Sequence, residues 1–110
     1  MGAAALADIG ELFPDTDPAH RGRDSGEMLQ TAWRKVAEQG YGIVNLDCIV
    51  FIQQPKLSPY KETIRRRIAE LLEIAPERVG LKAKTGEAVG PVGRQEAIMA
   101  KAIVLLEKKE

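Results

Sequence analysis

The segment GIVNLDCIVFIQQ, residues 42–54, constrains the fold of this 110-residue chain more than any other. It is rich in β-branched residues, and alternate positions bring five apolar side chains onto one face: Val44, Leu46, Cys48, Val50 and Ile52. The opposite face is mixed and runs from Ile43 to Gln53. This alternation predicts a β-strand with one buried face, which Pro55 ends.

Two helices are predicted on either side of this strand. The first is capped by Asp24 or Ser25, follows the helical period and ends at Gly40. The second begins at Ser58 and Pro59, the order of a cap followed by a proline in the first turn. Three consecutive arginines, residues 65–67, fan across its outer side at about 100° per residue, which favours a solvated surface over a phosphate clamp.

A second strand is predicted at residues 79–83, where Val79, Leu81 and Ala83 alternate with Gly80 and Lys82. The last apolar segment, residues 97–107, fits either a helix or a strand whose inward residues are Ala100, Ala102, Val104 and Leu106. The length of the chain predicts one domain over residues 1–110.

Composition excludes several classes of protein. Sixteen basic residues balance sixteen acidic ones, whereas nucleic-acid-binding domains carry a basic excess, so no nucleic-acid partner is expected. One cysteine excludes an intrachain disulfide. The longest apolar runs are too short to span a membrane, and residues 1–7 lack the pattern of a signal peptide. We therefore expect a cytoplasmic protein without a membrane partner.

Three loop segments carry residues suited to ligand chemistry. Residues 8–17 bring together Asp8, Asp15 and Asp17, which either accept hydroxyl protons of a polyol, hold a hard cation, or simply cap turns. Residues 53–58 follow the long strand, and backbone N–H groups there with Lys56 either cradle a phosphate or form a plain turn. In residues 84–87, Thr85 offers a hydroxyl and a carboxylate follows it.

The isolated histidine and cysteine point to no metal centre. His20 has no second histidine as a companion, so a structural or surface role is favoured over zinc ligation. Cys48 lies on the apolar face of the predicted strand and is expected to be an inert core residue.

Three stretches together carry a family resemblance: GAAALADIGELFPDTDPAHRGRDS, QQPKLSP and VGLKAKTGEAVGPVGRQEAI. They resemble the 2-C-methyl-D-erythritol 2,4-cyclodiphosphate synthase family over essentially all 110 residues. The resemblance implies a lyase of non-mevalonate isoprenoid biosynthesis that releases CMP from a cytidine-diphospho-methylerythritol 2-phosphate. It also implies an α/β fold with a mixed β-sheet packed on helices, and a homotrimer with active sites between subunits. The ions that it implies are Zn²⁺ and a second divalent ion, Mg²⁺ or Mn²⁺.

The resemblance also implies roles for individual residues. Thr85 matches the threonine that stabilises the transition state, and Glu87 matches the ligand of the second divalent ion. The methylerythritol segment comprises Asp8, Ile9, Gly10, Phe13, Pro14, Asp15, Thr16 and Asp17. The cytidine and phosphate segment comprises Ile52, Gln53, Gln54, Pro55, Lys56, Leu57 and Ser58, joined by Lys84, Thr85, Gly86 and Glu87. Pro91 and Arg94 match positions that line the central channel of the trimer.

Some positions depart from the family pattern. The family's zinc ligands, an Asp-x-His pair and a helical histidine, precede the segment with which this chain begins, so the chain lacks them together with the first strand. We expect no tight zinc binding and no activity of the 110-residue chain alone. The alternative is an inactive fragment that keeps cytidine-nucleotide binding and trimer assembly. Pro91 replaces a common aromatic residue, while Lys84 and Gly86 replace hydroxyl residues.

Overall fold

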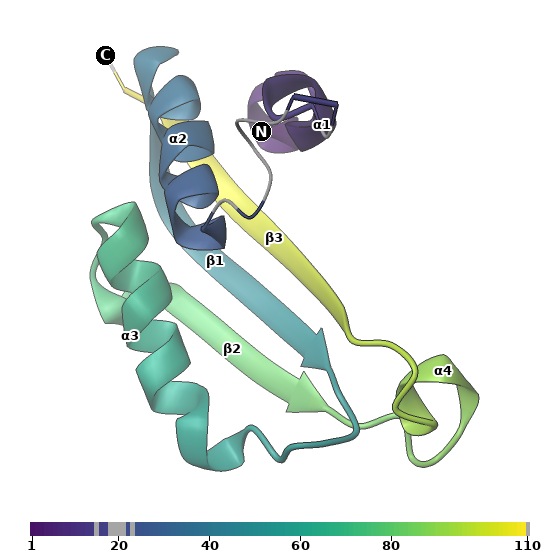
Figure 1. The fold of residues 1–110 in the computed structure, drawn as a ribbon. Helices are drawn as coiled ribbons and strands as arrows, with labels where there is room; N and C mark the ends of the chain where they lie inside the picture. Colours follow the sequence, from purple (N-terminus) through teal and green to yellow (C-terminus); the bar gives the residue numbers. More distant parts are fainter. Residues whose placement is uncertain (15, 18–21, 23, 110) are drawn as a thin grey trace.

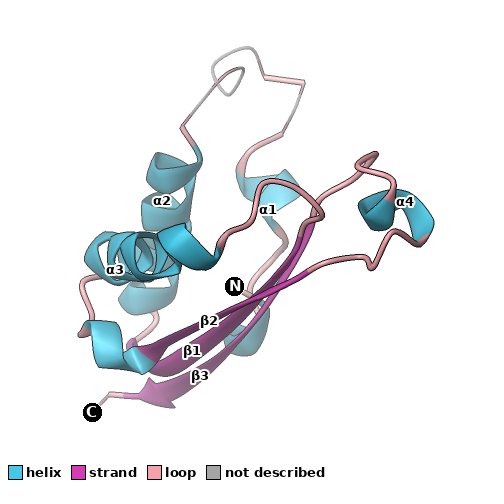
Figure 2. Ribbon diagram, turned by 90° about the horizontal axis from the view of Figure 1, so that it is seen from below, coloured by secondary structure: helices cyan, strands magenta, loops and turns pink. Residues whose placement is uncertain are grey.

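The computed structural model describes residues 1–14, 16–17, 22 and 24–109. Its sheet has the strand order β2-β1-β3, formed by β1 (Tyr41–Phe51), β2 (Val79–Lys84) and β3 (Met99–Lys108). Strand β1 is parallel to β2 and antiparallel to β3. Helices α2 (Ser25–Glu38) and α3 (Lys61–Leu72) lie over one face of the sheet (Figures 1 and 2). The predicted mixed α/β fold is confirmed.

Short helical turns connect these elements. They are η1 (Gly2–Ala4), α1 (Ile9–Leu12), η3 (Ser58–Tyr60), η4 (Pro76–Arg78) and α4 (Gly90–Gly93). None of the helices in the described part of the chain is long and apolar enough to cross a membrane.

Helix α2 begins and ends as the sequence predicts. The Asp24 side chain caps it by accepting a hydrogen bond from the Glu27 backbone N–H at 3.1 Å. Beyond its last turn, Gly40 adopts φ = +88°, a left-handed conformation that costs glycine little. Its buried residues, Ala32 and Val36, face β1 and α3. The cap and the terminal glycine therefore set the length of this helix.

The alternation predicted for β1 fails at its start because the strand contains a β-bulge. Ile43 pairs with Leu106 and Asn45 with Leu105, which leaves Val44 as the extra residue. Ile43 is only 6% exposed and lies with Leu46 beside α2. The prediction that placed Ile43 on the opposite, mixed face of the strand was therefore wrong. One inserted residue reverses which side chains face the core.

The ambiguous segment at the C-terminal end forms the strand β3, not a helix. Val104 and Leu106 are half-buried as the strand interpretation predicts. Ala102 is exposed but lines the same apolar groove beside α2, so it faces inward as predicted, whereas Ala100 is exposed and that part of the prediction was wrong. Helix α2 covers the end of the sheet where β1 begins and β3 ends, so the start of β3 lies beyond it (Figure 1).

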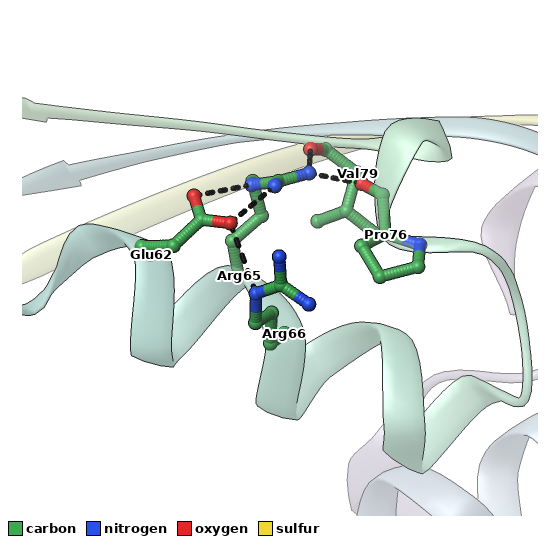
Figure 3. A network of polar contacts seen from close by, with 5 residues as sticks. All are labelled: Glu62, Arg65, Arg66, Pro76 and Val79. Carbon is green, nitrogen blue, oxygen red and sulfur yellow. Dashed lines mark hydrogen bonds and ion pairs between the residues drawn. The ribbon is translucent and has the colours of Figure 1, made fainter.

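The three arginines of α3 do not share one environment. The predicted solvated surface was wrong for Arg65. Its side chain is only 24% exposed and donates hydrogen bonds to the backbone carbonyls of Pro76 and Val79 (Figure 3). The Glu62 carboxylate accepts from the same guanidinium at 2.6 and 3.1 Å. Arg66 and Arg67 are 66% and 58% exposed, as predicted. Arg65 therefore ties η4 and the first residue of β2 to α3.

Candidate functional site

The parallel pairing of β1 and β2 brings two of the three predicted ligand segments together. Parallel strands end at the same edge of a sheet, which is where open α/β sheets bind ligands. Strand β1 leads into residues 52–58 and β2 into residues 84–87, and the Ile52 N–H donates to the Lys84 carbonyl at 2.9 Å. The two segments therefore leave the sheet side by side (Figure 1).

A side chain joins the two segments beyond the sheet. The Gln53 side-chain oxygen, Oε1, accepts hydrogen bonds from the backbone N–H of Gly86 at 3.1 Å and of Ala88 at 3.4 Å. An amide oxygen has two lone pairs, so these two donors fill its capacity. The end of β1 is thus fastened to the loop that follows β2.

That loop has an unusual backbone. Glu87 and Ala88 both adopt left-handed conformations, with φ of 51° and 62°, which cost residues other than glycine about 1–2 kcal/mol each. Gly86 lies directly against Gly93 of α4, so that a Cβ on Gly86 would come within 2.7 Å of the Gly93 Cα. A Cβ on Gly93 would come within 2.5 Å of the Ala88 carbonyl carbon. The surrounding contacts must hold this shape.

Thr85 and Glu87 present their functional groups to solvent from this loop. The Thr85 hydroxyl oxygen, Oγ1, accepts a hydrogen bond from the Glu87 backbone N–H at 3.2 Å. The hydroxyl proton remains free to donate to a ligand, because a hydroxyl both donates and accepts. Lys84, Thr85 and Glu87 are all exposed, so the arrangement offers a cation, a donor and a carboxylate at one edge.

The turn after β1 is equally open to solvent. Its Gln54–Pro55 peptide bond is cis. Ile52, Gln53 and Leu57 are half-buried, while the exposed residues of the turn are Gln54, Pro55, Lys56 and Ser58. The Lys56 ammonium is thereby available to a ligand phosphate at the edge that also carries Thr85.

The third predicted ligand segment, which begins at Asp8, lies away from the other two in the structure. Asp8 caps α1, its Oδ1 accepting from the Glu11 N–H at 3.0 Å, and Phe13 is buried with 7% of its surface exposed. Helix α1 lies near the N-terminus, at the other end of the sheet from residues 52–58 (Figure 1). Ile9, Gly10, Pro14, Thr16 and Asp17 are exposed; Asp15 and His20 lie outside the described residues. One chain does not bring this segment to the other two.

Pro91 lies in α4, and Arg94 directly follows this helix. The Arg94 guanidinium pairs with the Glu96 carboxylate through contacts of 3.1 and 3.2 Å, and both side chains are exposed. Val89 and Ile98 nearby are 74% and 67% exposed. This end of the molecule therefore combines an ion pair with uncovered apolar side chains.

The donor groups fit a magnesium ion better than a zinc ion. Within residues 1–14, 16–17, 22 and 24–109, no three His, Cys, Asp or Glu side chains converge as a zinc site requires. Burial, reinforced by the Asp47 carboxylate, raises the pKa of the Cys48 thiol, which disfavours the thiolate that binds metals. Mg²⁺ is commonly held by one or two carboxylates and substrate phosphates, and the exposed Glu87 suits that mode.

Sequence reasoning missed how the loop is held. It assigned Gln53 to a ligand segment and did not connect its side chain with residues 86–88, which are 33 to 35 positions away. It also gave no role to Gly93. The glycine-rich composition of residues 84–94 was the available signal, since close backbone approach requires glycine.

Comparison with known proteins gives matches over nearly the whole chain. A family model described as the YgbB family matches residues 1–107. A curated 2-C-methyl-D-erythritol 2,4-cyclodiphosphate synthase of Bacillus cytotoxicus is 50% identical over 109 residues, which is 99% of this chain and 69% of that relative.

Solved structures agree with the sequence comparison. The bifunctional IspDF of Campylobacter jejuni superimposes with a TM-score of 0.93 and 40% identity, covering 97% of this chain and 29% of that one. A CDP-bound 2C-methyl-D-erythritol-2,4-cyclodiphosphate synthase gives a TM-score of 0.83 and 35% identity, covering 93% of this chain and 65% of that one. The chain thus spans about two thirds of these single-function relatives.

Proposed function

Because the chain belongs to the YgbB family, we propose that it carries the cytidine-diphosphate side of a 2-C-methyl-D-erythritol 2,4-cyclodiphosphate synthase site. The observation that carries the proposal is the meeting of residues 52–58 and 84–87 at one edge of the sheet, joined by Ile52 and Gln53. A solved relative is described in its CDP-bound form, which supports this class of ligand. The compartment we propose is the cytoplasm.

The proposed reaction is an intramolecular phosphoryl transfer. An oxygen of the substrate 2-phosphate attacks the β-phosphorus of the cytidine diphosphate group and forms a new P–O bond. The bond from the β-phosphorus to the CMP oxygen breaks, and CMP leaves with the electron pair. Such a reaction needs positioning and charge stabilisation and no covalent intermediate with the protein.

The residues of the edge suit these tasks. Lys56 offers a point charge to the diphosphate, and the Thr85 hydroxyl offers a hydrogen bond to oxygens that gain charge in the transition state. Glu87 would hold Mg²⁺, which supplies neutralisation of phosphate charge when bound. The exposed positions of all three side chains support this assignment.

A complete site on this plan takes residues from two subunits. Helix α1, which carries part of the polyol segment, lies at the other end of the sheet from residues 52–58, so this part of the segment does not meet the nucleotide turn within one chain (Figure 1). We propose a homotrimer in which the polyol segment of one subunit faces the nucleotide segment of its neighbour. The open face of the sheet, where Ile103 and Leu105 are 74% and 55% exposed, offers apolar surface for such contacts.

The second candidate is a fragment that binds the nucleotide without turning over substrate. The basis of this candidate is that the exposed side chains of Lys56 and Thr85 suffice to contact a diphosphate without the polyol segment. Both candidates predict CDP binding and differ only in CMP release.

Calorimetric titration with CDP tests the nucleotide site. Replacing Lys56 by alanine removes one charge-assisted contact, and we expect the affinity for CDP to fall about ten- to a hundredfold. Lys35→Ala, an exposed lysine of α2 at the other end of the molecule, is the matched control and should bind as the unchanged chain does. Absence of CDP binding, or equal affinities for all three proteins, would refute the proposed site.

Release of CMP from the cytidine-diphospho substrate in the presence of Mg²⁺ separates the two candidates. Turnover by the 110-residue chain, abolished in Thr85→Val, supports the complete synthase. CDP binding without CMP release supports the nucleotide-binding fragment.

A further inference from the structure

The side chain of Gln53 joins the nucleotide turn to the loop of residues 84–88. Gln53 follows β1 by two positions and is half-buried, whereas the next residue, Gln54, is exposed. Its Oε1 accepts from the N–H groups of Gly86 and Ala88, the two residues on either side of Glu87. The Gln53 oxygen therefore binds the backbone on both sides of Glu87.

The loop depends on such an acceptor because its own backbone does not favour the observed shape. Glu87 and Ala88 are both left-handed, and the Gly86–Gly93 contact excludes any compensating shift toward α4. The left-handed turn points the N–H groups of residues 86 and 88 in the same direction, at Gln53. Without the acceptor, both donors would lose their partner and the turn could relax.

The same turn sets the orientation of Thr85. The Glu87 N–H lies between the two N–H groups held by Gln53, and it donates to Thr85 Oγ1 at 3.2 Å. That hydrogen bond occupies an acceptor site of the hydroxyl and leaves its proton for a ligand. A chain of contacts thus runs from Gln53 through the backbone of residues 86–88 to the hydroxyl of Thr85.

We infer that Gln53 is a positioning residue, which holds the Thr85–Glu87 loop in the shape that binds the diphosphate and does not itself contact the ligand. This inference rests on the proposed nucleotide site for its functional consequence. Its structural part concerns only the loop and can be tested without any ligand.

Amide hydrogen exchange measured by NMR tests the structural part. In Gln53→Leu, which keeps the size of the side chain and removes the acceptor, the Gly86 and Ala88 amides should exchange at least about tenfold faster. Gln53→Glu keeps an acceptor at the same reach and should retain protection, whereas Gln53→Asn is one methylene too short and should lose it. Amides of β1 report whether each variant is folded.

A glutamine outside the loop provides the control for this exchange experiment. Gln39→Leu, an exposed glutamine just after α2, should leave both loop amides as they are. Unchanged exchange at Gly86 and Ala88 in Gln53→Leu and Gln53→Asn would overturn the inference. If Gln53→Leu does not fold, the comparison of Gln53→Glu with Gln53→Asn decides in its place.

CDP titration tests the functional part. We expect Gln53→Leu to lower the affinity about three- to tenfold, and to bring the effect of Thr85→Val on CDP affinity close to zero, because the hydroxyl is no longer held in place. A purely structural role for Gln53 would leave the Thr85→Val effect intact and would refute positioning. If the unchanged chain fails to bind CDP, the proposed function fails while the exchange result still stands.

Discussion

The two halves of the helix-covered face are packed very differently. On the β2 side, Val79 and Leu81 are 3% and 8% exposed beneath α3, and Leu72 at the end of that helix is 5% exposed. On the β3 side, Val104 and Leu106 are only half-buried. An apolar groove of about 570 Å³ lies there between η1, α2 and the sheet, with Leu29, Trp33, Val36, Leu46, Cys48 and Leu106 among its lining residues.

The loop of the candidate site extends from the better-packed half of the molecule. Helix α3, η4 and β2 form one well-packed unit, and the loop of residues 84–87 extends directly from it. The β3 half contributes hydrogen bonds to β1 but few buried side chains, because β3 is exposed along most of its length. Apolar packing in the β2 half should therefore dominate the free energy of unfolding.

A core deletion in each half gives the largest expected contrast. We expect Leu81→Ala to lower the free energy of unfolding by about 2–4 kcal/mol, since it removes buried methyl groups and leaves a cavity. Leu106→Ala, in the half-buried wall of the groove, should cost roughly 1 kcal/mol or less. Urea unfolding followed by circular dichroism measures both. Equal losses would mean that the two halves contribute alike.

Removal of the Arg65 hydrogen bonds to η4 and β2 should have the next largest effect on stability. Arg65→Met keeps the aliphatic stem but removes the guanidinium that donates to the carbonyls of Pro76 and Val79, although the Pro76 carbonyl keeps the hydrogen bond from the Val79 N–H. We expect the urea midpoint to fall, by less than in Leu81→Ala. The matched variant Arg66→Met alters a side chain that is 66% exposed and should change the midpoint little. If the urea midpoint falls as far in Arg66→Met as in Arg65→Met, the Arg65 hydrogen bonds do not stabilise the fold as proposed.

The smallest expected effect is a dependence of stability on pH. The hydrogen bond from Arg65, aided by the charges of Arg65 and Arg66, lowers the pKa of Glu62 below its ordinary value. Since the folded pKa lies below the unfolded one, the stabilisation is present at neutral pH. It is lost as the pH falls below the ordinary pKa of glutamate and through the lower folded pKa.

Urea midpoints across that acidic range provide the measurement. Glu62→Gln should flatten the decline relative to the unchanged chain, whereas Glu38→Gln on α2 should reproduce it. A decline of the same steepness in Glu62→Gln would show that other carboxyl groups are responsible.

Local signals in the sequence were sufficient for much of the fold. The Asp24 cap, the glycine after α2 and the alternation of Val79 and Leu81 each depend on neighbouring residues, and the structure confirms all three. The mixed sheet was implied by the family resemblance, not by these local signals. The YgbB family match confirms the resemblance, while the roles given to individual site residues stay predictions.

Features that depend on distant partners could not be predicted in this way. The bulge that buries Ile43 reflects its register with β3, some 60 positions later. The position of Arg65 depends on carbonyls of η4 and β2, and that of Gln53 on the backbone of residues 86–88. Neither helical nor strand periodicity carries information about such contacts.

The contact between Gly86 and Gly93 also limits how the loop can evolve. Any replacement of either glycine adds at least a Cβ, which would meet backbone atoms instead of a movable side chain. Variation in the loop is therefore confined to positions such as Thr85 and Glu87, whose side chains are exposed. A randomised library of residues 84–94 should return glycine at both positions whichever ligand is used for selection, so ligand preference can drift while the backbone frame stays fixed.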